Sequence, residues 1–136
     1  IYLLYFKLMK KLLILLFSIL ISFNTYGEWI LVSGDDIADG YIETDTITKQ
    51  NEYVYFWILQ NKHTRDKYGS MSAMIYTQGD CGINRDKTLT IFFYTEPMGK
   101  GEKIGEGYTP ENPEWNYQMP GSIGGTLLSW ACKYVK

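Results

Sequence analysis

The sequence of 136 residues is poor in the residue types on which catalytic and metal sites usually depend. It has one histidine, His63, and two cysteines, Cys81 and Cys132. A catalytic triad or a zinc centre needs several His, Cys or acidic side chains brought together. No such set stands out here, so we expect a protein that is not an enzyme and that carries no cofactor and no metal ion.

A run of basic residues is also missing. Without residues 1–27, whose removal is argued below, ten basic residues remain against fifteen acidic ones, a net charge of −5. Nucleic acids and anionic lipids bind clustered Lys and Arg. The acidic balance therefore argues against a nucleic-acid partner and against a membrane-surface role.

The first part of the chain has the composition of an export signal. Met9–Lys11 is positively charged, Leu12–Phe23 is apolar apart from two serines, and the small residues Thr25 and Gly27 occupy the positions that a signal peptidase reads. The apolar run is about a dozen residues long, whereas a membrane-spanning helix needs ~20. A cleavable signal peptide is the interpretation that this pattern favours.

We therefore predict that translation starts at Met9, that residues 1–8 are an upstream extension, and that cleavage follows Gly27. The mature chain, 28–136, would be a single domain in the periplasm, on the cell surface or outside the cell. The alternative is a signal anchor that is never cleaved, which the lysines within the apolar stretch disfavour.

The two cysteines both lie in the mature part. An even pair in an exported chain indicates a disulfide bond between Cys81 and Cys132. Neither belongs to a C-x-x-C motif, which disfavours a redox-active dithiol. The bridge would close a loop of about 50 residues and contribute ~4 kcal/mol to stability.

Several segments have the composition of β-strands. Residues 28–32 and 41–43 flank turn residues and predict a first hairpin. The run 53–59 is apolar throughout, which predicts a central strand covered on both faces. Residues 70–77 alternate, as in a strand with one face on the core, and 87–94 predict another long strand.

The stretches between these strands are expected to be irregular. Gln50–Glu52 is predicted as a connection, and 61–68 as a charged loop. Residues 96–121 contain four prolines and several glycines, which is typical of a binding loop or a flexible flap. Trp115 and Tyr117 are expected to attach part of this long connection to the body of the domain.

Residues 122–136 predict a C-terminal helix. Ser122 suits the N-cap position, and an apolar stripe follows at helical spacing: Leu128, Ala131, Cys132 and Val135. We therefore predict an α+β fold, with an antiparallel sheet of about five or six strands and a C-terminal helix packed on one face and tethered by the disulfide.

Three groups of polar residues are candidate sites. Asp35, Asp36 and Asp39 could hold calcium, but their spacing is not that of an EF-hand loop, and a solvated hairpin tip is favoured. Glu43 and Asp45 share strand parity, yet nothing else supports a glycosidase pair. His63 is expected to be a solvated loop residue.

Aromatic residues offer one further candidate. Structural packing is the favoured role, and a patch for partner or self association is the alternative. The set comprises Trp29, Tyr53, Tyr55, Trp57, Tyr76, Phe92 and Tyr94.

The order of several motifs resembles bacterial surface-adhesin protein E-like domains. The resemblance covers residues 28 to 136 and rests on Trp29, Tyr41–Ile47, Tyr55–Leu59, Ser70–Ser72, Gln78–Cys81, Pro97–Gly99 and Trp130–Cys132. It implies an antiparallel sheet with a disulfide-tethered C-terminal helix, and an exported non-enzymatic protein that contacts host matrix or serum proteins or envelope partners, and that could form a homodimer.

The expected interaction surface comprises His63, Arg65, Tyr68, Met98, Tyr108 and Trp115. The runner-up function is a structural or envelope-maintenance role in the periplasm, and the second alternative is an unrecognised hydrolase.

Overall fold

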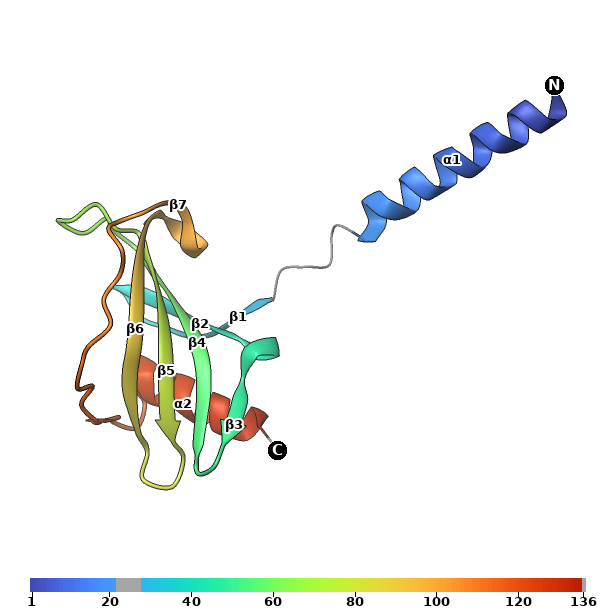
Figure 1. Ribbon diagram of the computed structural model, residues 1–136. Coiled ribbons are helices and arrows are strands. Elements are labelled where there is room, and N and C mark those ends of the chain that lie inside the picture. Colours follow the sequence, from blue (N-terminus) through green and yellow to red (C-terminus); the bar gives the residue numbers. More distant parts are fainter. Residues whose placement is uncertain (22–27, 136) are drawn as a thin grey trace.

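The computed structural model describes residues 1–21 and 28–135. Helix α1 (Tyr2–Ile21) forms the first part, and the second part is a β-rich domain (Figure 1). Within these described residues, no helix is both long and apolar enough to cross a bilayer. The predicted cleavage after Gly27 lies outside the described residues, so the signal peptide stays a prediction.

The domain is built on one antiparallel sheet. Its six main strands run in the order β1-β2-β4-β5-β6-β7, while β3 pairs with the first part of β4 and β8 with the start of β6. The strands are β1 (Trp29–Gly34), β2 (Ala38–Glu43), β3 (Thr48–Gln50), β4 (Tyr53–Lys62), β5 (Ser72–Asp80), β6 (Arg85–Glu96), β7 (Lys100–Lys103) and β8 (Asn116–Tyr117). The predicted sheet class is confirmed, with two short strands beyond the six.

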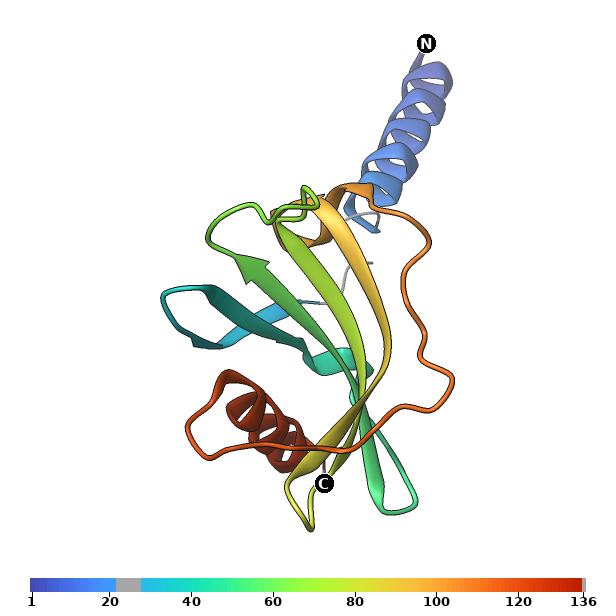
Figure 2. The same ribbon diagram turned by 90° about the vertical axis from the view of Figure 1, so that its left-hand side faces the viewer.

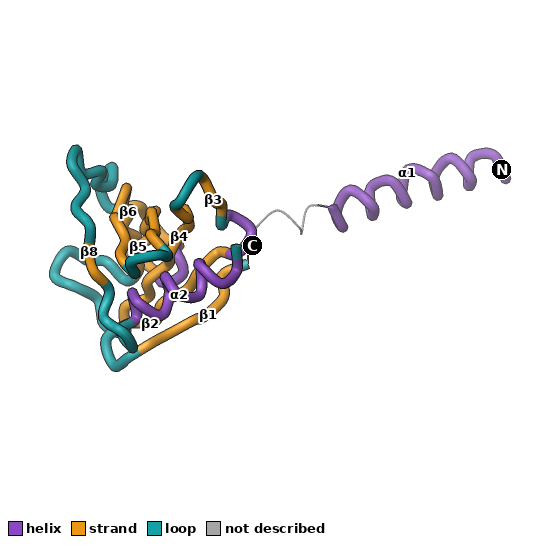
Figure 3. Tube along the Cα trace, turned by 90° about the horizontal axis from the view of Figure 1, so that it is seen from below, coloured by secondary structure: helices purple, strands orange, loops and turns teal. Residues whose placement is uncertain are grey.

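Helix α2 (Ile123–Tyr134) packs on one face of this sheet, against β1, β2 and β4 (Figures 2 and 3). The core forms between them from apolar side chains that both elements bury: Ile42, Val54, Phe56, Ile58, Leu127, Leu128 and Ala131. Burial of these side chains is the main term that holds the helix on the sheet. We call the face under α2 the inner face and the opposite one the outer face.

The helix begins and is tethered as the sequence predicts. Ser122 is the N-cap, and its Oγ accepts a hydrogen bond from the Gly125 amide at 3.0 Å. Cys81, in the β5–β6 turn, forms the disulfide with Cys132 in the last part of α2. Gly79 allows the close approach of helix and sheet, because a Cβ there would lie 2.5 Å from Cδ1 of Leu128.

The prediction that β4 is covered on both faces holds only in part: on the outer face Leu59 is fully buried under Pro97–Gly99, but the rest of that face is not. Val54 and Phe56 are buried beneath α2, whereas Tyr55 and Trp57 point to the outer face and are only partly buried. The residue pattern could not separate the faces, since both are apolar. Large aromatic rings tolerate partial exposure because their edges and polar atoms can meet water.

The segment 96–121 is more ordered than a structureless connection. It contains the short helix η2 (Pro97–Gly99) and strands β7 and β8, and Tyr108 exchanges two backbone hydrogen bonds with Ile91, each 2.9 Å. Strand β6 would otherwise be an edge with unpaired backbone groups, and this segment satisfies part of that edge.

The predicted connection at Gln50–Glu52 is in fact the turn of a hairpin. Strand β3 pairs with the start of β4, and Asn51 between them adopts φ of 57°. Asparagine is one of the few residues that tolerates this left-handed conformation. Between β2 and β3 the chain forms the short helix η1 (Thr44–Thr46).

Candidate functional site

Aromatic rings gather on the outer face of the sheet. In the β4–β5 register Trp57 lies opposite Tyr76, and the ring centres are 4.9 Å apart. Tyr55 lies 6.3 Å from Tyr76, and Phe92 of β6 lies 6.2 Å from Trp57. These distances are typical of interacting aromatic pairs.

The long connection adds to this group from the side of β6. The ring of Trp115 lies 5.5 Å from that of Tyr53, as expected for a residue that attaches the connection to the domain. Tyr117 follows in β8 and is 66% exposed. We call the whole set the outer aromatic face: Tyr53, Tyr55, Trp57, Tyr76, Phe92, Trp115 and Tyr117.

Cations lie directly on these rings. The Arg85 guanidinium carbon is 4.2 Å and Lys87 Nζ is 4.3 Å from the ring centre of Trp115. Lys103 Nζ lies 5.2 Å from that of Phe92. Arg85 also forms an ion pair with Asp80, with Nε to Oδ2 at 3.0 Å. The outer aromatic face therefore combines flat apolar surface with positive charge.

The six residues of the expected interaction surface fall into two groups. Arg65 is in the β4–β5 loop and donates to the Thr95 carbonyl at 2.6 Å, and Met98 of η2 donates its amide to Asn61 Oδ1 at 2.8 Å. These two, with His63 and Tyr68, belong to the β4–β5 loop and the η2 turn. Tyr108 and Trp115 lie instead along β6, and a binding role for either group stays a prediction.

His63 lies in the β4–β5 loop with its side chain 40% exposed, as predicted, and it also has two polar partners. Its Nδ1 lies 2.9 Å from the Asp36 carbonyl oxygen, and Nε2 lies 3.1 Å from Asp39 Oδ2. The hydrogen bond to the Asp36 carbonyl and the one to Asp39 raise the pKa of His63. The side chain thus links the β4–β5 loop to the β1–β2 hairpin.

The aspartate cluster has a structural role in the same hairpin. Asp35 Oδ1 accepts hydrogen bonds from the amides of Ile37 and Ala38, at 2.8 and 2.9 Å. These bonds, the one from Ala38 foremost, lower the pKa of Asp35. Within residues 1–21 and 28–135, no group of three or more His, Cys, Asp and Glu is arranged to hold a metal ion.

Strand alternation does not relate Glu43 and Asp45. Glu43 ends β2, while Asp45 belongs to η1, where the backbone no longer alternates. The Glu43 carboxylate accepts a bond from the Thr46 hydroxyl at 3.4 Å. Strand parity therefore does not place these two carboxyl groups on one face.

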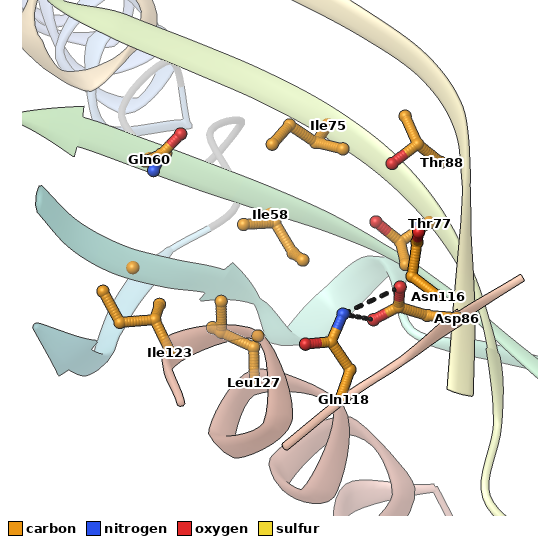
Figure 4. Close-up of a pocket in the computed structure, with 12 residues that line it drawn as sticks. Ile58, Gln60, Ile75, Thr77, Asp86, Thr88, Asn116, Gln118, Ile123 and Leu127 are labelled. Atoms are coloured by element: carbon orange, nitrogen blue, oxygen red, sulfur yellow. Dashed lines mark hydrogen bonds between the residues drawn. The ribbon is translucent and has the colours of Figure 1, made fainter. Parts of the chain in front are cut away.

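A cavity lies on the inner face, at the start of α2 (Figure 4). Its volume is about 240 Å³. The polar side chains of Thr77, Asp86, Asn116 and Gln118 gather toward one end, and Ile58, Ile123 and Leu127 lie toward the other (Figure 4). Gln60 lies on the side of Ile58 (Figure 4), so the cavity has one polar end and one mostly apolar end.

Asp86 is the ionisable residue among those that line this cavity, and it is only 7% exposed. Burial raises the pKa of its carboxyl group, and the hydrogen bonds from Gln118 oppose that effect. Gln118 Nε2 donates to both carboxylate oxygens, at 3.1 and 3.0 Å. Gly124 leaves room for this amide, since a Cβ there would lie 2.4 Å from Gln118 Oε1.

The local sequence does not single out Asp86, because the run Arg85–Lys87 looks like a solvated stretch. The available signal was strand parity, which places Asp86 and Thr88 on the face opposite Arg85 and Lys87. A single carboxyl group does not provide the acid and base that hydrolysis usually needs.

Solved structures of Haemophilus influenzae protein E share this fold. Crystal form II matches with a TM-score of 0.57 and 17% sequence identity, over 81% of this chain and 91% of that one. The selenomethionine form gives 0.60 and 17%, over 81% and 89%. Protein E from a non-typeable strain gives 0.55 and 14%, over 82% and 80%. At such identities the likeness concerns the fold alone.

No curated protein sequence matches the chain. The family model of surface-adhesin protein E, however, matches residues 29–133, which is nearly the whole β-rich domain. The chain belongs to the surface-adhesin protein E family.

Proposed function

We propose that this chain is an exported, non-enzymatic binding protein that contacts a protein partner through the outer aromatic face. The observation that carries the proposal is the set of seven aromatic side chains on the sheet face opposite α2, with three cations over the rings of Phe92, Trp115 and Tyr117. Tyr, Trp and Arg are the residues most enriched at the energetic centres of protein interfaces. Membership of the adhesin family supports the same class of function.

The charges indicate what kind of partner segment fits. The mature chain has a net charge of −5, yet Arg85, Lys87 and Lys103 all lie on the outer aromatic face. Complementary charge favours encounter with the right partner. The partner would therefore present acidic side chains next to apolar or aromatic ones.

A cross-linking experiment tests the face. The photoreactive residue p-benzoylphenylalanine replaces Tyr117 on the outer aromatic face or, as a matched control, Tyr134 on α2, which is 51% exposed. Irradiation of intact cells is expected to give a discrete adduct from position 117 and none from 134. Charge reversal by Lys87→Glu and Lys103→Glu should weaken that adduct. Equal adducts from both positions, or none from 117, would contradict the proposal.

The adduct also separates the candidate partners. Identification by mass spectrometry distinguishes a host matrix or serum protein from an envelope protein, and an adduct of twice the chain mass indicates a homodimer. Protease treatment of intact against lysed cells then locates the domain. Digestion on intact cells supports surface display, and protection until lysis supports the runner-up, a periplasmic envelope role.

A further inference from the structure

The inner cavity lies on the opposite face of the sheet from the proposed partner interface, and its carboxyl group is left with spare hydrogen-bonding capacity. An ionised carboxylate has about four acceptor positions. Among the residues that the structure describes, Asp86 receives hydrogen bonds from a single nitrogen, Nε2 of Gln118. Because that amide is neutral, the carboxylate charge is not compensated by it.

The two cations next to Asp86 in sequence do not compensate the charge either. Strand alternation directs Arg85 and Lys87 to the outer face, where Arg85 pairs with Asp80 and both stack on Trp115. A buried carboxylate without a cationic partner is costly. A ligand that brings a positive charge would remove this cost.

We propose that the cavity binds a small organic cation, with a primary ammonium group on Asp86 and a short apolar chain against Ile58, Ile123 and Leu127. The ammonium donates three hydrogen bonds. Besides the carboxylate, the hydroxyl groups of Thr77 and Thr88 and the Asn116 side chain line the same cavity. The apolar end then covers the hydrocarbon part of the ligand.

The dimensions and chemistry of the cavity favour a small organic cation over other kinds of ligand. A volume of about 240 Å³ is close to the lower end, ~300 Å³, of pockets that hold small molecules. A divalent metal ion prefers several oxygen ligands with more than one carboxylate, and Asp86 is the one carboxylate in the lining. An anion would meet repulsion from Asp86.

Butylammonium is the probe that tests the site on the full chain, with butanol as its neutral counterpart. We expect saturable binding of butylammonium, with NMR shifts at Ile75, Thr88 and Leu127 around the cavity. Butanol should bind at least about tenfold more weakly, as expected for the loss of a charge-assisted hydrogen bond. Asp86→Asn should remove the preference for butylammonium, whereas the control Asp45→Asn in η1 should keep it.

A second measurement needs no variant. Saturation with butylammonium should lower the pKa of Asp86, because the bound cation favours the ionised form. The pKa is measured from the pH dependence of the ¹³C chemical shift of the Asp86 carboxyl carbon. Three results would overturn the proposal. They are equal binding of butanol and butylammonium, undiminished butylammonium binding to the Asp86→Asn variant, and an Asp86 pKa that butylammonium leaves unchanged. None of these results depends on a protein partner, so the proposed function is tested separately.

Discussion

The guanidinium carbon of Arg85 lies 4.2 Å from the ring centre of Trp115, so a residue of β6 holds the long connection against the sheet. Lys87 adds a second cation to the same ring. Trp115→Ala removes both contacts, each worth ~0.5–1 kcal/mol at partly exposed sites, together with buried apolar area. We expect the free energy of unfolding to fall by about 2 kcal/mol in chemical denaturation followed by circular dichroism.

The matched control for this contact is Trp115→Phe, which keeps a ring under the two cations. The free energy of unfolding of Trp115→Phe should fall by less than half as much as that of the alanine variant. Equal losses for both variants would show that the cations contribute nothing at this position.

The disulfide between Cys81 and Cys132 is predicted to be a major part of the stability. Its loop spans 51 residues, for which the chain-entropy relation gives about 4 kcal/mol. Cys132→Ser should lower the melting temperature substantially and increase amide exchange throughout α2. Reduction of the wild-type protein should reproduce the loss, and the double variant Cys81→Ser, Cys132→Ser should not respond to reductant. An unchanged melting temperature would mean that α2 docks without the bridge.

The buried carboxyl group of Asp86 predicts an unusual pH dependence. Its pKa is raised on folding above the ordinary 3.8, so the native state binds the proton more tightly than the unfolded state. This contribution is fully present below pH 3.8 and is lost as the pH rises through the folded pKa. Asp86→Asn should therefore be more stable than the wild type at neutral pH, and the difference should disappear in acid.

Urea denaturation of the two proteins across this pH range measures the effect. A difference that stays constant with pH would show that the carboxyl group does not titrate abnormally.

Asp66, in the β4–β5 loop, predicts a dependence of stability on pH that is opposite to that of Asp86. Its carboxylate accepts hydrogen bonds from Lys62 and from the amides of Ser70 and Tyr68, and its pKa is lowered to about 2, with the Lys62 bond as the largest cause. A depressed pKa gives stability that is present above pH 3.8 and lost as the pH falls toward 2. Asp66→Asn should abolish this acid-sensitive part, and amide exchange should rise in the loop. A pH profile like that of wild type would refute this role.

The close approach of α2 to the sheet predicts a cost for a single methyl group at Gly79. The added Cβ would lie 2.5 Å from Leu128 and 3.0 Å from Val54. Overpacking of a tight core costs roughly 1–3 kcal/mol, so Gly79→Ala should destabilise by that order in thermal unfolding. At Gly82, where the closest atom is 3.5 Å away, the same substitution should have little effect.

The parts of the fold that could be predicted from sequence are those with a strong local signal. Ser122 followed by an apolar stripe defines α2, and the alternation in 70–77 defines most of β5. The short strands β3, β7 and β8 could not be found, because their residues are exposed and carry no periodic pattern. These segments are strands because their backbones form hydrogen bonds with β4 or β6, and not because their side chains are buried.

The candidate site was less predictable than the fold. The aromatic residues were visible in the sequence, but their placement on the outer face depends on which side α2 covers. The burial of Asp86 depends on β8 and on Gln118, 32 positions away along the chain. Contacts of such sequence separation leave no mark on the local pattern.

In and next to strand β8, successive side chains point alternately to the outer and the inner face of the sheet. Trp115 and Tyr117 belong to the outer aromatic face, while Asn116 and Gln118 line the cavity. The segment 115–118 thus borders both sites, and a single local opening of this segment would expose both to solvent. A partner that clamps Trp115 would also slow the exit of a molecule from the cavity, so the lifetimes of the two complexes would be linked.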